Sequence, residues 1–249
     1  MKYIRLRAIF IVFLSAGSLC MAQQTPPSSS TTSLTGDAER LADAQHKLDD
    51  FGGLTRYHDA NATLAPMEKG RVVFFGDSIT DSWVRNGGKF FPGKPYINRG
   101  IGGETTPQML IRFRQDVLDL HPETVVILAG TNDIAGNTGP STQQMIADNF
   151  ISMVELARAN HIRVILASVL PAADYPWKPG MDPAPKIRAL NAWLADYCKQ
   201  QHLTYLDYYS AMADENGGMK PGISLDGVHP NAAGYAIMEP LAEAALSKK

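Results

Sequence analysis

Ser78, His229 and Asp226 have the residue types and surroundings that nucleophilic catalysis requires. Ser78 closely follows the apolar run 71–75, where a buried strand is expected to give way to a helix. His229 lies three residues after Asp226, and Gly227 between them lets the chain bend so that the carboxylate can orient the imidazole. Because a serine hydroxyl is a weak nucleophile until a base takes its proton, the pattern predicts a set of nucleophile, base and acid.

Gly103 and Asn132 add hydrogen-bond donors that such chemistry would use. Gly103 has no side chain, so its N–H can approach a substrate oxygen closely. Asn132 carries an NH₂ group that can point into the same space. Together with the backbone N–H of Ser78, these groups would make three donors to a developing oxyanion.

Each of these residues also has an ordinary structural interpretation when it is taken alone. Ser78 could cap a helix, Asn132 could be a turn residue, and His229 could be a surface histidine before a proline. The stretch 100–103 could be a turn or an incomplete dinucleotide-binding fingerprint, since Thr105 stands where the third glycine would be. The ordered set favours catalysis over these interpretations.

Short apolar runs alternate with helical patterns along most of the chain. Short runs that are mostly apolar predict strands buried on both faces, at residues 72–75, 96–98, 124–128, 163–168 and 204–207. Helical patterns cover residues 107–118, 141–159, 185–201 and 231–247. Thr106 and Ser141 are the expected N-caps of the first two helices. The alternation predicts an α/β fold, a three-layer α/β/α sandwich around a central, mostly parallel sheet of five strands.

Ser78, Gly103 and Asn132 each follow one of the first three expected strands. The carboxyl ends of parallel strands lie at one edge of a sheet, and ligands bind outside that edge. We therefore expect these three residues to converge in space. Their neighbours Asp77 and Asp133 are expected to brace the loops through hydrogen bonds rather than to react.

The loop 172–185 follows the fourth expected strand and should overhang the same edge. Tyr175 and Trp177 in this loop are candidate substrate contacts, either by stacking or by apolar contact. The alternative is that the loop packs on its own body. Trp83, one turn beyond the serine, is expected in the core rather than in a substrate wall.

In their order along the chain, these stretches resemble the SGNH hydrolases, also called the GDSL esterase and lipase family. The likeness covers nearly the whole expected folded unit, from about residue 71 to residue 245. The four marker residues of that family would be Ser78, Gly103, Asn132 and His229. In the same likeness Asp226 is the acid, and Glu104 stands at a non-catalytic position where many relatives have Asp.

The resemblance implies a serine esterase that works without a cofactor. Ser78 would attack the ester carbonyl, with His229 as general base, and Ser78 N–H, Gly103 N–H and the Asn132 side chain would hold the oxyanion. Because no long apolar insertion reads as a lipase lid, we expect short acyl groups, such as acetyl esters of carbohydrates. The alternatives are a lysophospholipase, thioesterase or arylesterase of the same family, or a non-catalytic glycan-binding module.

The bulk composition excludes some other classes. A formal net charge of −2 gives no basic excess that would favour nucleic acid or an anionic membrane surface as a partner. A hydrophobic content of 45% and a charged content of 19% fit a globular domain with a sizeable core. The histidines other than His229 are scattered without metal-ligand spacing, so we expect no metal site.

The amino terminus predicts export. Lys2, Arg5 and Arg7 precede an apolar run that is too short for a comfortable membrane span, and small residues follow it. Cleavage after Ala22 would remove Cys20 and leave Cys198 as the only cysteine, expected in the core. We expect a periplasmic or secreted protein with no stable membrane span after cleavage. The expected organisation is a signal peptide at 1–22, a disordered Ser/Thr/Pro-rich spacer at 23–36, a helical extension at 37–53 and a catalytic domain at 54–249.

Overall fold

A computed structural model describes residues 36, 38, 41, 42, 45, 48–65 and 68–248. The chain divides into two compact units, residues 1–44 and 45–249. The described residues of the first unit are helical. The expected signal peptide at 1–22, and all of the spacer at 23–36 except Gly36, lie outside the described residues.

The second unit is built on one sheet of five strands, all paired in parallel in the order β2-β1-β3-β4-β5. The strands are β1 (Val72–Gly76), β2 (Tyr96–Gly100), β3 (Thr124–Leu128), β4 (Arg163–Ala167) and β5 (Thr204–Leu206). The central strands β1 and β3 are buried at every residue, as their unbroken apolar sequences predict. The predicted five-stranded α/β fold is therefore confirmed, with every strand parallel.

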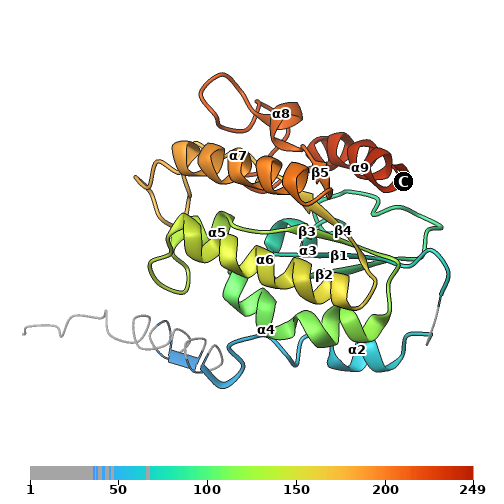
Figure 1. Cartoon of the computed structure of the whole chain (residues 1–249). Coiled ribbons are helices and arrows are strands. Elements are labelled where there is room, and N and C mark those ends of the chain that lie inside the picture. Colours follow the sequence, from blue (N-terminus) through green and yellow to red (C-terminus); the bar gives the residue numbers. More distant parts are fainter. Residues whose placement is uncertain are drawn as a thin grey trace, which may run out of the picture. The chain divides into compact units, whose positions relative to one another are not determined.

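Helices cover both faces of this sheet and make the outer layers (Figure 1). Apolar side chains of α4, α6 and α7 pack with one face of the strands, and those of α3, α8 and α9 pack with the other. The longer helices are α4 (Thr106–Asp116), α6 (Gln143–Ala159), α7 (Ala184–Gln200) and α9 (Ala232–Ser247). The shorter ones are α2 (His58–Ala62), α3 (Ser78–Asp81), α5 (Thr131–Ala135), α8 (Tyr209–Met212) and the 3₁₀ turn η1 (Leu118–Leu120). Trp83 and Cys198 lie in the core, as expected.

The N-caps of two helices differ from prediction by one residue. Helix α4 is capped by Thr105 rather than Thr106, because Thr105 forms a reciprocal capping box with Gln108. Helix α6 is capped by Thr142 rather than Ser141, since the Thr142 hydroxyl accepts a hydrogen bond from Met145 N–H at 3.2 Å. In both cases two hydroxyl residues stand side by side, and local sequence does not separate them.

The order of strands places β1 at the point where the chain changes direction across the sheet. From β1 the chain crosses to β2 on one side and then to β3 on the other, so β2 and β3 flank β1. In open α/β sheets such a switch point opens a crevice outside the carboxyl ends of the strands. Gly100 ends β2 where a side chain would collide with the backbone of α3, so glycine lets the two elements pack closely.

Residues 50–57 lie along α4 and reach the end of β2. Asp50 accepts hydrogen bonds from the N–H groups of Leu54 and Thr55 at 2.7 and 2.9 Å. The side chain of Gln108 on α4 donates to the carbonyl of Phe51 at 2.8 Å. The Tyr57 hydroxyl donates to the carbonyl of Gly100, just before the loop that carries Gly103. This segment is therefore part of the folded unit.

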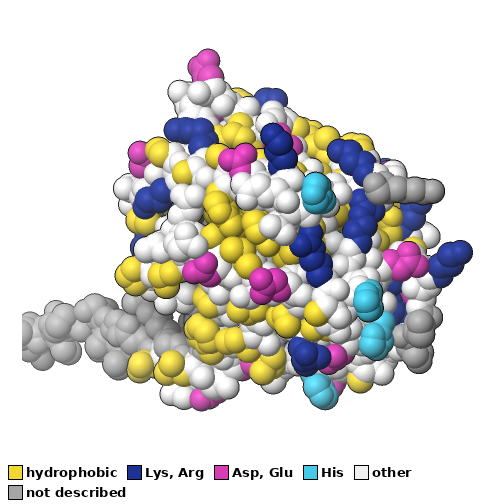
Figure 2. All heavy atoms as spheres, viewed as in Figure 1, with side chains coloured by type: hydrophobic (Ala, Val, Ile, Leu, Met, Phe, Trp, Pro, Cys, Tyr) yellow, Lys and Arg dark blue, Asp and Glu magenta, His cyan; other side chains and the backbone are white. Residues whose placement is uncertain are grey.

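The face covered by α4, α6 and α7 carries charges of both signs between apolar side chains (Figure 2). Lys and Arg side chains are interspersed with Asp and Glu on this face, in keeping with the small net charge of the chain.

Candidate active site

Ser78 is the first residue of α3, two residues after the end of β1. Because β1 is buried along its whole length, the serine is carried by a rigid part of the fold. Asp77, rather than Ser78, caps the short helix, since its Oδ1 accepts a hydrogen bond from Ile79 N–H at 3.0 Å. The Ser78 hydroxyl is therefore not used as a helix cap.

Ser78, His229 and Asp226 form one hydrogen-bonded chain. The Ser78 hydroxyl oxygen lies 2.9 Å from Nε2 of His229, which is 151 positions later in the sequence. The other ring nitrogen, Nδ1, lies 2.8 Å from Oδ2 of Asp226. A carboxylate only accepts hydrogen bonds, so Nδ1 carries the proton and Nε2 accepts from the serine hydroxyl. This tautomer is the one that a general base needs.

A tight turn before α9 holds the imidazole and the carboxylate together. Oδ1 of Asp226 accepts hydrogen bonds from Val228 N–H at 3.0 Å and from His229 N–H at 2.8 Å. Gly227 between them has φ of 86°, in the left-handed region that glycine adopts without strain. The side chains of His229 and Asp226 are 23% and 35% exposed, so this half of the site is open to solvent.

The same turn keeps Asp226 ionised. Partial burial alone would raise the pKa of Asp226, but hydrogen bonds from the His229 N–H, the His229 ring and the Val228 N–H together lower that pKa below its usual value. An ionised carboxylate beside Nδ1 can stabilise the imidazolium that forms when His229 takes a proton.

Gly103 lies in the loop after β2, and Asn132 lies in α5, which follows β3. Gly103 has φ of 80°, and a Cβ placed on the preceding Gly102 would lie 3.9 Å from Cβ of Ser78. Asn132, in α5, is 2% exposed, and its Nδ2 donates to the carbonyl of Glu104 at 2.9 Å. The structure thus brings all five predicted residues to one edge of the sheet.

A buried arginine, Arg112 of α4, joins the loop of Gly103 to the ends of the strands. Its guanidinium contacts Oε2 of Glu104 at 2.6 Å and Oδ2 of Asp116 at 3.0 Å. It also donates to the carbonyls of Gly76 and Arg99, each at 3.0 Å. Because Glu104 directly follows Gly103, this arginine fixes the base of the loop that approaches Ser78.

Three buried carboxyl groups surround this half of the site. Burial raises the pKa of Asp77 to about 7 and that of Glu104 to about 7, although hydrogen bonding and the Arg112 charge partly oppose the two shifts. Burial also raises the pKa of Asp133. Asp133 accepts hydrogen bonds from Thr106 N–H at 3.0 Å and from the Thr106 hydroxyl at 2.6 Å, so it ties α5 to α4, as expected of a bracing residue.

Trp177 lies beside the imidazole, whereas Tyr175 does not reach the surface. The Trp177 ring is centred 5.9 Å from the His229 ring, and the residue is 43% exposed. Tyr175 is 0% exposed, its ring stacks against Trp177 at 5.0 Å, and its hydroxyl lies 3.0 Å from that of Thr131. Tyr175 nevertheless lines a pocket together with Asp226, so its role as a substrate contact stays a prediction, and its ring also supports Trp177.

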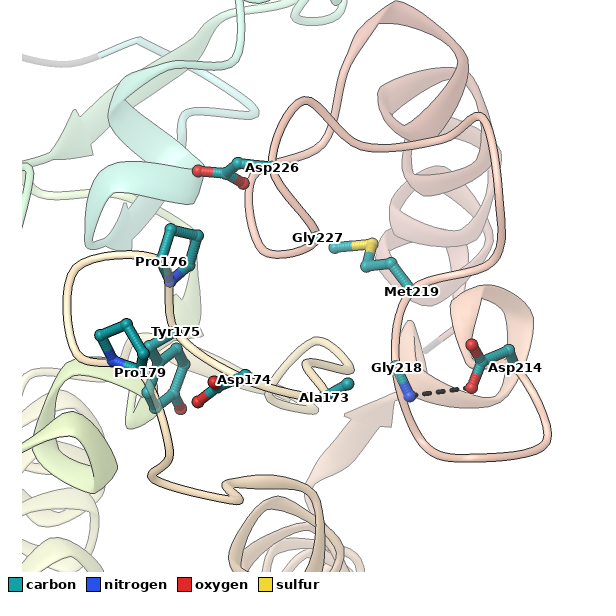
Figure 3. Close-up of a pocket in the computed structure, with 10 residues that line it drawn as sticks. All are labelled: Ala173, Asp174, Tyr175, Pro176, Pro179, Asp214, Gly218, Met219, Asp226 and Gly227. Atoms are coloured by element: carbon teal, nitrogen blue, oxygen red, sulfur yellow. Dashed lines mark hydrogen bonds between the residues drawn. The ribbon is translucent and has the colours of Figure 1, made fainter.

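A pocket of about 310 Å³ opens next to Asp226. Figure 3 shows Asp226 and Gly227 on one side of it and the turn that carries Pro176 and Pro179 on another. Asp214, Gly218 and Met219 line another part of it, where the dashed line marks the hydrogen bond from Gly218 N–H to Asp214 at 2.9 Å. The pocket therefore adjoins the acid of the hydrogen-bonded chain and gives room for part of a ligand.

Sequence reasoning missed two residues that contact the site. Arg112 falls on the same face of α4 as the buried Met109, Phe113 and Asp116, and a charged side chain within an apolar helical stripe could have indicated it. Asn137 donates to Oδ1 of Asn132 at 2.9 Å, but it stands in a polar turn where nothing in the local sequence distinguishes it.

Within the described residues, no helix combines the length and apolar character needed to cross a membrane. Over the same residues, no three or more His, Cys, Asp or Glu side chains are grouped so that they could hold a metal ion.

Comparisons with known proteins identify relatives over most of the chain. The model of the GDSL-like lipase/acylhydrolase family matches residues 74–237. A crystal structure of a putative acylhydrolase from Bacteroides fragilis is 48% identical, with a TM-score of 0.76, and the match covers 78% of this chain and 96% of that one. Human platelet-activating factor acetylhydrolase IB subunit alpha2 is 26% identical over 221 residues, which are 84% of this chain and 91% of the human protein. An uncharacterized lipoprotein of Bacillus subtilis is 37% identical over 81 residues, covering 31% of this chain and 33% of the lipoprotein.

Proposed function

The chain belongs to the GDSL-like lipase/acylhydrolase family, and from this premise we propose that it is a serine esterase that uses Ser78, His229 and Asp226. The observation that carries the proposal is the pair of short contacts, 2.9 Å from the serine hydroxyl to Nε2 and 2.8 Å from Nδ1 to the carboxylate. These distances lie within the range required for proton transfer by a general base.

In the proposed reaction, the Ser78 hydroxyl attacks the ester carbonyl while His229 Nε2 takes its proton. The carbonyl oxygen becomes negative and is held by Ser78 N–H, Gly103 N–H and the Asn132 side chain. His229 then gives the proton to the leaving alcohol, and an acyl group stays on the serine. A water molecule, deprotonated by His229, attacks this acyl-enzyme, and His229 returns the proton to the Ser78 oxygen as the ester bond to the acyl group breaks, which releases the acid and restores the serine hydroxyl.

We propose short acyl esters of carbohydrates, acetyl esters in particular, as the substrate class. The exposed indole of Trp177, beside His229, offers an apolar face on which a sugar ring could stack. The pocket next to Asp226 gives space for the alcohol part of the ester. The human relative is named as an acetylhydrolase, which supports the preference for acetyl groups.

The mechanism is tested with a fluorophosphonate probe, which labels an activated serine covalently. The purified protein should be labelled stoichiometrically, S78A should not be labelled, and S152A, which removes an exposed hydroxyl on α6, should be labelled like the parent. Absence of labelling in the parent protein would refute the proposal and favour a glycan-binding module.

The substrate class is tested by comparing acetylated xylo-oligosaccharides with acetyl, octanoyl, thioester and lysophospholipid substrates. Highest kcat/KM on acetylated sugars supports the proposal. Fastest turnover of octanoyl esters, lysophospholipids or thioesters would instead assign one of the other acylhydrolase activities of the family.

Export is a separate proposal, supported by the basic, apolar and small-residue pattern of the first 22 residues. The Bacillus subtilis protein that is similar to part of this chain is described as a lipoprotein, which is in keeping with export. Protein recovered from the cell envelope should have lost residues 1–22. An intact amino terminus on that protein would contradict cleavage.

A further inference from the structure

Asn137, in the turn after α5, bonds to three parts of the site at once. Its Nδ2 donates to Oδ1 of Asn132 at 2.9 Å and to the carbonyl of Gly103 at 3.2 Å. Its Oδ1 accepts from the indole Nε1 of Trp177 at 3.3 Å. The residue is exposed, so these contacts are not a consequence of burial in the core.

The chemistry of the partners permits only one orientation of the two amides. The carbonyls of Gly103 and Glu104 accept hydrogen bonds only, and the indole N–H of Trp177 donates only. Nδ2 of Asn132 must therefore face Glu104, and its Oδ1 must face Nδ2 of Asn137. If the Asn132 amide turned over, like groups would face each other at two contacts, and if the Asn137 amide turned over they would do so at three.

The turn that carries Trp177 is fastened to the same helix at further points. The Lys178 amine donates to the carbonyl of Ala135 at 2.6 Å, and the Tyr175 hydroxyl lies 3.0 Å from the Thr131 hydroxyl. Both partners belong to α5, which also carries Asn132. The Asn137 side chain is the contact at which this turn, α5 and the loop of Gly103 meet.

We propose that Asn137 is a positioning residue that sets the orientation of the Asn132 amide. This inference rests on the proposed esterase function. Nδ2 of Asn132 has two hydrogens, and the bond to Glu104 uses one of them. With Asn137 in place, the second hydrogen stays available to the substrate oxyanion. Asn137 does not touch the reacting atoms, and its effect on turnover passes through Asn132.

The test uses N137D, which keeps the shape of the side chain and the acceptor for Trp177 but removes both donors. Activity is measured on 4-nitrophenyl acetate. Losing one oxyanion donor lowers turnover by on the order of 10²–10³, so N132A should fall in that range. N137D should lower kcat by about 10–100-fold, a share of that loss, with KM changed by less than about threefold.

A double-mutant cycle shows whether the two residues act together. In the N132A background, adding N137D should cost less than about threefold more, because the group that Asn137 orients is already absent. The control N160A removes an exposed asparagine whose Nδ2 bonds to Leu156 at the end of α6, and it should turn over like the parent.

Two results would overturn the inference. One is that N137D has the kcat of the parent. The other is that N137D lowers kcat by the same factor in the N132A background as it does in the parent. Should N137D fail to fold, N137A and the N132A/N137A pair replace it, with the same expectations for the cycle. A parent protein that hydrolyses no ester refutes the proposed function itself, whereas an active parent with an unaffected N137D refutes this inference alone.

Discussion

Gly103 and Asn132 are held by contacts between distant parts of the chain, whereas Asp226 and His229 hold each other within four residues. The first pair depends on Arg112, Glu104 and the carbonyls at the ends of β1 and β2, all buried. The second pair depends on two backbone N–H groups in its own turn and is partly exposed. We call Gly103 and Asn132 with their contacts the oxyanion half of the site, and Asp226 and His229 the base half. Substitutions in the oxyanion half should therefore change stability and activity together, whereas substitutions in the base half can change activity alone.

The largest expected effect lies in the base half and tests this separation directly. H229A should lower kcat/KM by about 10⁴-fold or more, because no other group takes the serine proton. The free energy of unfolding should change by about 1 kcal/mol or less, since the side chain is partly exposed. Urea unfolding and ester hydrolysis measure the two quantities, with H58A on the exposed α2 as control. A large loss of stability in H229A would show that stability and activity are coupled in the base half as well.

The next effect lies in the oxyanion half. R112M should lower the free energy of unfolding by about 3–5 kcal/mol, because it leaves the buried carboxylates of Glu104 and Asp116 without their cation. Urea unfolding at pH 8 measures the change.

Arg114, on the exposed side of the same helix, offers a matched control. Its ion pair with Asp119 is loose, at 3.9 Å, and both side chains are more than half exposed. R114M should change the free energy of unfolding by about 0.5 kcal/mol or less. Equal losses in R112M and R114M would contradict the role assigned to the buried arginine.

A smaller effect concerns Asp77 and depends on pH. Burial raises its pKa to about 7 in the folded protein, from about 3.9 in an unfolded chain, so ionisation above pH 7 opposes folding. Stability from this group is therefore present at low pH and is lost as pH rises from about 4 to 7. D77N keeps the oxygen that accepts from Ile79 but cannot ionise.

The advantage of D77N over the parent in the free energy of unfolding should grow by about 2–3 kcal/mol between pH 5 and pH 8. Urea titrations of both proteins at the two pH values measure it. The pH 5 comparison is the internal control, because folded Asp77 is neutral there. A constant difference in the free energy of unfolding between D77N and the parent across this pH range would show that burial does not raise the pKa of Asp77.

The smallest predicted effect concerns the helix cap that borders the base half. Asn231 caps α9, accepting from Ala233 and Gly234 N–H at 2.9 and 3.2 Å, and it immediately follows the turn of His229. N231A should lower the free energy of unfolding by about 1 kcal/mol. T142A, which removes the cap of the distant α6, should cost about the same.

Turnover then separates the two caps. N231A should reduce kcat by roughly tenfold or less through a small displacement of the imidazole, and T142A should leave it unchanged. Equal turnover in both variants would show that the base turn keeps its geometry without its helix cap.

The sheet was predictable because its central strands are short, largely apolar runs that alternate with helical patterns. Strand β3 has the expected bounds, and β1 extends the expected run by the single residue Gly76. The caps of α4 and α6 were each misplaced by one residue, because adjacent hydroxyl residues can both cap and the choice depends on backbone geometry.

Within the site, the residues predicted from sequence are those whose role depends on their immediate neighbours or on the ordered motifs. Asp226 and His229 lie three positions apart, and Ser78 follows a strand. Arg112 and Asn137 also act through side-chain contacts with residues 8–40 positions away, and the sequence next to them does not specify these partners. The hydroxyl of Tyr175 likewise contacts that of Thr131, 44 positions away, which its own loop sequence does not indicate.

The segment from Asp50 to Tyr57 has a practical consequence for handling this protein. Its bonds to α4 and to the end of β2 begin upstream of residue 54. A recombinant chain started at residue 54 would lack the carboxylate of Asp50 and the carbonyl of Phe51, and the neighbourhood of Gly100 would lose part of its support. Fusion tags and protease sites are better joined ahead of residue 45, where the second unit starts.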